Sequence, residues 1–127
     1  MNQNEVCQLD SKSIFIIEDD DAIRESLQEL LVEEGYSVTC AENGKHALEL
    51  IDASKIAMPC LVLLDLNMPV MSGDEFLVKV RKIPEWKDTA VAVFTAAGNK
   101  AKPELATDFI KKPINIDELL EIVQRYC

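Results

Sequence analysis

The sequence predicts an α/β fold in which a parallel sheet lies between layers of helices. Five short aliphatic runs alternate with segments whose apolar residues recur at helical spacing. Most of the runs end in polar residues or turn formers. Such alternation is typical of a parallel sheet that is covered on both faces. The connections between its strands must be right-handed, which leaves few topologies.

Length and composition support one folded domain. Of the 127 residues, 48% are hydrophobic but only 6% are aromatic, so aliphatic side chains must fill the core. No apolar run approaches the roughly 20 residues that a membrane span needs. Residues 1–12 lack the basic start and the apolar stretch of a secretory signal. We therefore expect a cytoplasmic protein that does not bind membranes, with an N-terminal extension over 1–12 and a domain over 13–127.

The net charge of −10 limits the range of partners. Non-specific binding of nucleic acid depends on Lys and Arg side chains that neutralise phosphates. An acidic chain is poorly suited to that role, so no nucleic-acid partner is expected. The charge instead suits cations and basic protein surfaces.

The first predicted strand is Ser13–Ile17, and a helix follows it. The strand is a continuous apolar run, as expected when both faces of a sheet are covered. In the helix, apolar side chains at helical spacing form a single face: Ile23, Leu27, Leu30 and Leu31. Gly35 is well placed to end this helix.

The next two strands are predicted at Tyr36–Cys40 and Leu61–Leu64, with a helix between them. Asn43 can cap that helix by accepting a hydrogen bond from a free backbone N–H. The inward face of the helix consists of three apolar residues: Ala47, Leu48 and Ile51. The third strand is wholly aliphatic and ends at Asp65.

A capping box begins the next helix, with Ser72 at the cap and Glu75 three residues later. The inward face of this helix is again apolar: Phe76, Leu77, Val80 and Ile83. Pro84 limits its length.

The last two strands are predicted at Ala90–Phe94, which ends at Thr95, and at Thr107–Lys111. Asn115 can cap a final helix. Its inward face has the expected helical spacing: Ile116, Leu119, Leu120 and Val123.

Polar residues follow four of the predicted strands. The first strand ends in Glu18 and Asp19, the third in Asp65, and the fourth in Thr95, while the fifth runs into Lys112. The carboxyl ends of parallel strands share one edge of the sheet, where ligands bind in such folds. We therefore expect these five side chains to converge.

The three carboxylates predict a divalent cation. Two carboxylates about 5 Å apart repel by roughly 3 kcal/mol at an effective dielectric of about 20. Repulsion among Glu18, Asp19 and Asp65 would be a substantial share of the stability of a domain. Oxygen ligands suit Mg²⁺, with Mn²⁺ as an alternative, and the chain has no Cys and His set for zinc.

Lys112 and Thr95 extend this site toward phosphoryl chemistry. A Lys ammonium and a Thr hydroxyl can both donate hydrogen bonds to phosphoryl oxygens. Together with a metal they describe a site for a transferring phosphoryl group. The nucleophile would be the Asp65 carboxylate, which would become an aspartyl phosphate.

The sequence resembles the receiver domain of two-component response regulators. Five stretches match in the order of that family: Ile16–Asp20, Leu63–Pro69, Met71–Gly73, Val93–Ala96 and Phe109–Pro113. Each motif is weak alone, but five together at strand ends are very specific, and the resemblance spans nearly the whole chain from Ser13. It implies a flavodoxin-like three-layer sandwich whose five-stranded parallel sheet has the order 2-1-3-4-5.

The resemblance also implies how the site binds metal. Asp65 would be the phosphoacceptor. Asp19 and Asp65 would bind Mg²⁺ directly, together with the backbone carbonyl of Asn67. Glu18 would act through a water molecule.

Three further roles follow from the resemblance. Thr95 would bond the phosphoryl group and move toward it. Lys112 would pair with a phosphoryl oxygen, and the Lys112-Pro113 peptide bond would be cis. Phe109 would be the switch aromatic that turns inward as Thr95 shifts, although an ordinary core role for Phe109 is an open alternative.

The resemblance implies a bacterial signalling protein with protein partners. The phosphoryl group would come from a phosphohistidine on a sensor histidine kinase or a histidine phosphotransfer protein. The domain would catalyse its own phosphorylation and dephosphorylation without turning over a separate substrate. Its output would be altered binding to a downstream protein, and because the last helix ends at Cys127 we expect no attached output domain.

One segment departs from the family pattern. Lys112 follows Thr95 by only 17 positions, which is shorter than the usual gap by roughly a helical turn or more. The intervening Ala96–Ala106 contains Gly98 and Pro103, which are poor helix residues. We therefore expect the fourth helix to be short, irregular or mobile, and the output face to differ from the usual one.

Two other function classes fit parts of the pattern. A receiver-like binding module without phosphorylation is disfavoured, because the whole acidic, Thr and Lys set is retained. An aspartate-nucleophile phosphatase usually has a second Asp two residues after the nucleophile, and here that position is Asn67. Nucleotide binding lacks support, since neither G-x-x-x-x-G-K-S/T nor G-x-G-x-x-G occurs.

The four cysteines, Cys7, Cys40, Cys60 and Cys127, form no C-x-x-C pair and match no zinc spacing. Disulfides are rare in the cytoplasm. We therefore expect free, reduced thiols that are partly buried in the core.

Overall fold

The computed structural model describes residues 12–95 and 104–127. The strands within these ranges are β2 (Ser13–Ile17), β3 (Ser37–Ala41), β4 (Leu61–Asp65), β5 (Val91–Thr95) and β6 (Asp108–Lys111). The helices are α1 (Asp21–Glu33), α2 (Gly44–Asp52), α3 (Gly73–Val80), the 3₁₀ helix η1 (Pro84–Trp86) and α4 (Ile116–Tyr126). None of these helices combines the length and the apolar character required to cross a membrane.

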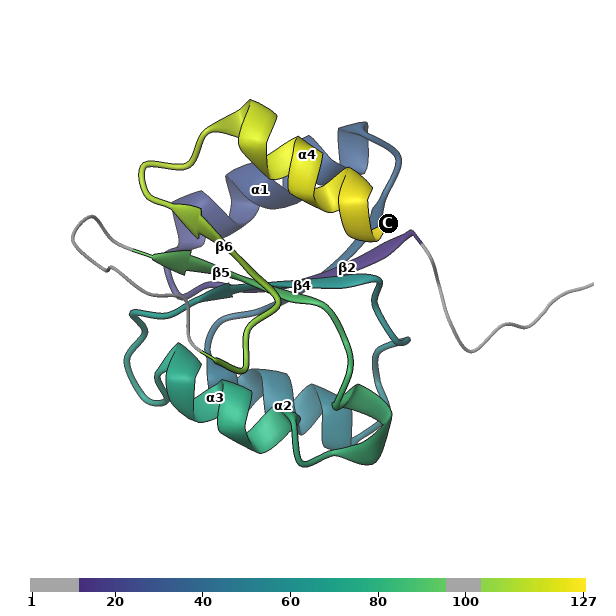
Figure 1. The fold of residues 1–127 in the computed structure, drawn as a ribbon, viewed down its shortest axis with the longest axis vertical. Helices are drawn as coiled ribbons and strands as arrows, with labels where there is room; N and C mark the ends of the chain where they lie inside the picture. Colours follow the sequence, from purple (N-terminus) through teal and green to yellow (C-terminus); the bar gives the residue numbers. More distant parts are fainter. Residues whose placement is uncertain (1–11, 96–103) are drawn as a thin grey trace, which may run out of the picture.

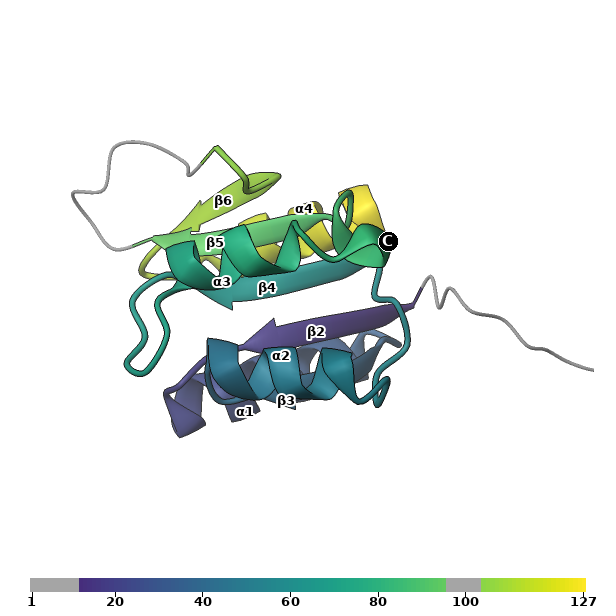
Figure 2. The same cartoon turned by 90° about the horizontal axis from the view of Figure 1, so that it is seen from below.

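The strands form one parallel sheet in the order β3-β2-β4-β5-β6. Counted along the chain this is 2-1-3-4-5, which confirms the predicted order. Figure 2 shows the strands side by side in this sequence. The register pairs Asp65 with Phe94 and Thr95 with Lys111, so the polar ends of β4, β5 and β6 lie at one edge.

Helices cover both faces of the sheet, as the predicted three-layer sandwich requires. Figure 1 shows α1 and α4 on one face and α2 and α3 on the other. Alternate residues of β2 divide between two apolar cores: Ile14 and Ile16 pack on the α1 and α4 side, whereas Phe15 and Ile17 pack on the α2 and α3 side. All four are at most 1% exposed, which explains the unbroken apolar run in the sequence.

The helix starts agree with the predicted caps. Asn43, Ser72 and Asn115 occupy the N-cap positions of α2, α3 and α4, and each side chain accepts a hydrogen bond from the backbone N–H three residues later. Asp20 caps α1 in the same way. Gly35 has a φ of 98° just after α1, a conformation that favours glycine.

Small differences from the sequence prediction occur at element ends. The second strand begins at Ser37 instead of Tyr36, and the last begins at Asp108 instead of Thr107. The helix predicted to include Ile83 ends at Val80, and Pro84 starts η1. Trp86 of η1 is buried and packs edge-on against Phe15, with ring centroids 6.2 Å apart.

The segment predicted to hold an altered fourth helix, Ala96–Ala106, lies mostly outside the described residues. Of its described part, Glu104 and Leu105 form a turn and Ala106 is irregular. The Arg81 guanidinium holds this turn, because its Nε and Nη2 donate to the Leu105 carbonyl at 3.1 and 2.9 Å. The return of the chain to the sheet is therefore fixed by a side chain at the end of α3.

The same Arg81 also binds the segment before β5. Its Nη1 donates to the carbonyls of Trp86, Lys87 and Thr89, at 2.7 Å in the case of Thr89. Burial lowers the pKa of the guanidinium, although a nearby carboxylate, Asp88, opposes this. One cation thus joins the segments that lead into β5 and β6.

The expectation of free thiols was wrong for one pair. Cys60 and Cys127 form a disulfide, with Cα atoms 5.4 Å apart. They are separated by 67 positions, and their proximity arises because α4 returns across the sheet to the start of β4. Cys40 is free and partly buried, as predicted, and burial raises the pKa of its thiol. Cys7 lies outside the described residues.

Candidate functional site

Three carboxylates meet at the carboxyl edge of the sheet. Oxygen atoms of Glu18, Asp19 and Asp65 all lie within 4.8 Å of one another. Glu18 and Asp19 follow β2, and Asp65 ends the neighbouring β4. Glu18 is 1% exposed and Asp65 2%, whereas Asp19 is open to solvent. The predicted acidic cluster is therefore present, with two members buried.

Asp65 is held by two donors. Its Oδ1 accepts from Lys112 Nζ at 3.0 Å and from the backbone N–H of Asn67 at 3.1 Å. The Lys112 side chain is partly exposed, at 28%, while the Asp65 side chain is almost fully buried. Because hydrogen bonds between charged groups are short and strong, the bond to the Lys112 ammonium fixes the position of this buried carboxylate.

Glu18 has an oxygen without a partner. Its Oε2 accepts from the Asp20 backbone N–H at 3.0 Å. Its Oε1 is the one buried side-chain polar atom in residues 12–95 and 104–127 that makes no hydrogen bond. Leaving such an atom unsatisfied typically costs about 1–3 kcal/mol, and more for a charged group.

The environment of Glu18 also opposes its ionisation. Burial is the main cause that raises its pKa to about 7, and the neighbouring Asp65 carboxylate raises it further, although the Asp20 N–H acts in the opposite direction. A cation placed among the carboxylates would give the Glu18 Oε1 a partner and would stabilise the ionised form of Glu18. The oxygen donors and the unpartnered Oε1 fit Mg²⁺, a hard cation that prefers oxygen ligands.

The loop after β4 has a conformation that its sequence requires. A Cβ on Gly73 would lie 2.7 Å from Leu66 Cα and 2.8 Å from the Asp65 carbonyl oxygen, so only glycine fits. The Gly73 N–H donates to the Leu66 carbonyl at 3.0 Å. This close approach folds the loop back on β4 and places the Asn67 N–H against Asp65.

Val70, at the tip of that loop, is strained. Its φ is 70°, in the left-handed region that β-branched residues rarely adopt. The side chain is 74% exposed, so packing does not explain the conformation. Strained backbone of this kind is often found at functional sites.

The structure brings Thr95 and Lys112 to the same edge. Thr95 is 2% exposed at the end of β5, next to β4. The Lys112 N–H donates to the Thr95 carbonyl at 2.8 Å, which ties the end of β6 to that of β5. The Lys112-Pro113 bond is cis, as predicted.

Phe109 lies on the edge strand β6 and is 39% exposed. Its neighbour Ile110 is fully buried in the core under α1 and α4, so the Phe109 ring faces the opposite side of the sheet. Partial exposure does not fit the alternative of an ordinary core residue.

One feature near the site was absent from the sequence prediction. A groove of about 260 Å³ lies between the start of α1 and the segment before α4, and its lining is mostly apolar: Ala22, Ile23, Ser26, Leu27, Ile114 and Ile116. Ile116 is 47% exposed. The only signal in the sequence was the apolar Ile114 and Ile116 beside a cap, and their proximity to α1 depends on tertiary structure.

Sequence comparison places these features in a known family. The profile of the response regulator receiver domain matches residues 14–124, from β2 into α4. The chain belongs to the response regulator receiver domain family. The predicted resemblance is thereby confirmed.

Individual relatives support the assignment of this receiver domain. It is 34% identical to sporulation initiation phosphotransferase F of Bacillus subtilis, covering 91% of this chain and 94% of that one. The structure is similar to Vibrio cholerae chemotaxis protein CheY4, with a TM-score of 0.78, 30% identity and coverage of 93% and 100%. It is also similar to response regulator TrrA of Thermotoga maritima in complex with Mg(2+)-BeF, with a TM-score of 0.77, 35% identity and coverage of 91% and 99%.

Membership sets the general function of this receiver domain. Receivers are phosphoaccepting signalling domains of two-component systems, and they bind Mg²⁺ in an acidic pocket. The cluster of Glu18, Asp19 and Asp65 fits that pocket. The roles of the individual residues stay predictions.

Proposed function

We propose that Asp65 accepts a phosphoryl group from a phosphohistidine and that the resulting aspartyl phosphate switches binding to another protein. The observation that supports this most is the buried Asp65 carboxylate, which lies 3.0 Å from Lys112 Nζ and beside the unpartnered oxygen of Glu18. Asp65 lies between the Lys112 ammonium and the proposed metal site. Both positive charges would stabilise the phosphoryl group while the Asp65 carboxylate attacks it.

In the proposed transfer, an Asp65 oxygen forms a bond to phosphorus while the bond from phosphorus to the imidazole nitrogen breaks. The nitrogen leaves with the electron pair and takes up a proton. Mg²⁺, or Mn²⁺ in its place, would be held by Asp19, Asp65 and the Asn67 carbonyl, with Glu18 acting through water, and would neutralise charge on the phosphoryl oxygens. Lys112 would exchange its bond with Asp65 for one with a phosphoryl oxygen.

The proposed switch uses β5 and β6. The Thr95 hydroxyl would donate to a phosphoryl oxygen and move toward Asp65. The partly exposed ring of Phe109 would then turn into the space that Thr95 leaves. The 2.8 Å bond between the Lys112 N–H and the Thr95 carbonyl supports coupling between the two strands.

We propose that the donor is a sensor histidine kinase or a histidine phosphotransfer protein that docks beside the acidic site. The mostly apolar groove between α1 and the start of α4 supports this, because it can receive an apolar helix face. The downstream target is another protein, and neither nucleic acid nor a membrane is a proposed partner. The proposed location is the cytoplasm, and the proposed domain limits are 13–127 after an extension over 1–12.

Turnover of a separate phosphate ester is not part of the proposal. Asn67 stands where a phosphatase of this chemistry has its acid or base, and its amide does not titrate. Its backbone N–H instead donates to Asp65. The domain would catalyse only its own phosphorylation and dephosphorylation.

The test is labelling by a small acyl phosphate with Mg²⁺, followed by intact mass. We expect one phosphoryl adduct on the wild-type chain and none on Asp65→Asn. Asp52→Asn, which changes an exposed carboxylate at the end of α2, should label like the wild type. The proposal fails if the wild type gains no adduct or if Asp65→Asn is labelled equally.

A further inference from the structure

A disulfide lies at the edge of the sheet opposite the acidic site. Cys60 precedes β4 and Cys127 follows α4. Both residues are half-buried, so neither is sealed in the core. We propose that Cys60 and Cys127 are a reversible thiol–disulfide pair, and that its redox state controls how firmly the end of α4 holds the edge strand β6.

Hydrogen bonds to one carboxylate of β6 join that strand to the residues of α4 next to the disulfide. The Asp108 Oδ2 accepts from Arg125 Nη1 at 2.7 Å and from the Tyr126 hydroxyl at 3.2 Å. Its Oδ1 accepts from the Phe109 backbone N–H at 2.9 Å. Arg125 and Tyr126 are the two residues before Cys127. The disulfide therefore holds their side chains where they reach Asp108.

The position of β6 in the sheet makes these hydrogen bonds to Asp108 important. Within the described residues, β6 pairs only with β5 and lies at one end of the strand order, with β3 at the other. It has four residues, fewer than any other strand of the sheet. A short edge strand gains little from its own pairing, so the contacts from α4 contribute a large share of its local stability. Breaking the disulfide would loosen the last turn of α4 and, through Asp108, the start of β6.

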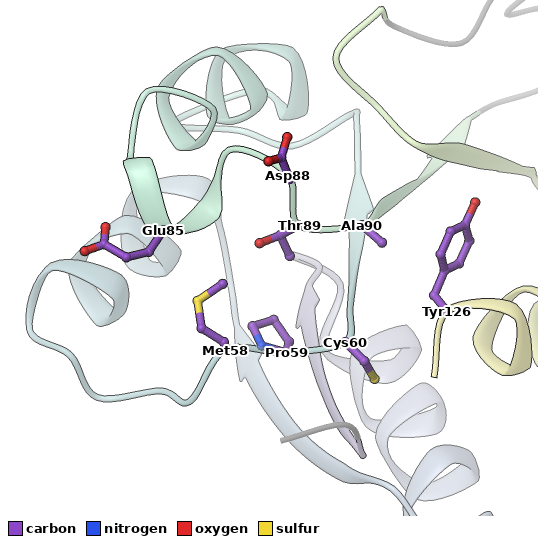
Figure 3. Close-up of a pocket in the computed structure, with 8 residues that line it drawn as sticks. All are labelled: Met58, Pro59, Cys60, Glu85, Asp88, Thr89, Ala90 and Tyr126. Atoms are coloured by element: carbon purple, nitrogen blue, oxygen red, sulfur yellow. The ribbon is translucent and has the colours of Figure 1, made fainter. Parts of the chain in front are cut away.

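A surface hollow lies beside Cys60, one of the two bonded cysteines. The hollow has a volume of about 450 Å³. Figure 3 shows Cys60 and Tyr126 on one side of it and Glu85 and Asp88 on the other. Glu85 and Asp88 are both exposed. These acidic side chains repel negative charge, which slows the approach of an anionic reagent but does not change the position of the redox equilibrium.

The exchange balances with a low-molecular-weight disulfide as oxidant. One cysteine thiolate attacks the reagent, forms a mixed disulfide and releases one reagent thiol. The second thiolate then attacks the protein sulfur and releases the other thiol. The two cysteines lose two electrons and two protons, and the reagent gains both. A dithiol reductant reverses the reaction.

The first experiment measures the redox couple on the full chain. The protein is equilibrated in buffers that differ in the ratio of reduced to oxidised glutathione. Its free thiols are then alkylated and its intact mass is measured. We expect the Cys60 and Cys127 thiols to disappear together, in one two-electron transition. Cys60→Ser and Cys127→Ser should each abolish that transition, whereas Cys40→Ser should leave it unchanged.

The second experiment measures the proposed coupling by hydrogen exchange. On reduction, exchange in residues 108–111 and in the last turn of α4 should accelerate roughly tenfold or more. The melting temperature should fall by roughly 10 °C, because the bond closes a long loop. Asp108→Asn should weaken the redox effect on β6 while leaving the redox transition itself intact.

Two results would overturn the proposal. One is independent alkylation of the two cysteines at every glutathione ratio. The other is a clean redox transition without any change of exchange in α4 and β6. The reduced wild-type chain provides both measurements if a Ser variant fails to fold. Neither experiment uses phosphorylation, so its outcome is distinct from that of the Asp65 proposal.

Discussion

The sheet has one edge at the carboxyl ends of its strands and an opposite edge at their amino ends. Different kinds of contact occur at these two edges. At the carboxyl edge, three acidic side chains crowd together with an unpartnered oxygen on Glu18, and the arrangement fits a cation and an incoming phosphoryl group. At the opposite edge, Arg81 donates to backbone carbonyls that are distant in sequence, and the Cys60–Cys127 bond adds a covalent link. One edge is arranged for a ligand, whereas the other is arranged for stability. Substitutions at the two edges should therefore have separable effects.

The largest expected effect is on phosphorylation at the carboxyl edge. Lys112→Met removes the cation that lies 3.0 Å from Asp65. We expect the initial rate of labelling by an acyl phosphate to fall by roughly two orders of magnitude, because one preorganised donor to the phosphoryl group is lost. Lys111→Met, at an exposed neighbour, is the control and should label at nearly the wild-type rate. Equal rates for the two variants would contradict the proposed role of Lys112.

The next effect is on stability at the opposite edge. Arg81→Met leaves the carbonyls of Leu105 and Thr89 without their donor. We expect a loss of about 3 kcal/mol in the free energy of unfolding, measured in urea. Lys82→Met, which changes an exposed neighbour, should alter stability by less than about 0.5 kcal/mol. Affinity for Mg²⁺ should be the same in both variants, and a large loss in Arg81→Met alone would show that the edges are not separable.

The third effect is a pH dependence that belongs to Glu18. Its pKa rises from 4.5 to about 7 in the folded state, mainly through burial. The folded state therefore binds more protons than the unfolded state between these values, and stability is lost as the pH rises through this window. Without metal we expect a decline of about 2 kcal/mol between pH 5 and pH 7.

Urea unfolding at the two pH values, with and without Mg²⁺, measures this decline. Saturating Mg²⁺ should remove or reverse it, because the cation stabilises the ionised carboxylate. Glu18→Gln should flatten the profile without metal. A decline of the same size in Glu18→Gln would assign the titration to another group.

The smallest effect concerns the strained loop beside Asp65. Val70→Asn places a residue that tolerates the left-handed region at the φ of 70°. We expect a gain of about 1 kcal/mol in thermal or urea unfolding. Val32→Asn replaces an exposed Val within the helix α1 and should not stabilise the protein. If Val70→Asn and Val32→Asn change the stability by the same amount, relief of backbone strain at Val70 is not the cause of that change.

The carboxyl edge was largely predictable from the sequence. Glu18, Asp65 and Thr95 each end an apolar run, and parallel topology is enough to place strand ends together. The caps at Asn43 and Ser72 were predictable for a similar reason, since a cap involves residues only three positions apart.

The opposite edge was not predictable in the same way. The Cys60–Cys127 bond joins residues 67 positions apart, and Arg81 contacts Leu105 across 24 positions. No local pattern indicates such contacts, because they depend on how α3 and α4 pack. Strain at Val70 was also hidden, since Val is not a residue that favours a positive φ.

The most direct test of the central claim is to locate the phosphoryl group on the chain. After labelling by an acyl phosphate with Mg²⁺, borohydride reduces an aspartyl phosphate to homoserine, which tandem mass spectrometry can place in the sequence. We predict homoserine at position 65 and at no other Asp. Homoserine at a different carboxylate, or phosphate on a Ser, Thr or His side chain, would contradict the account.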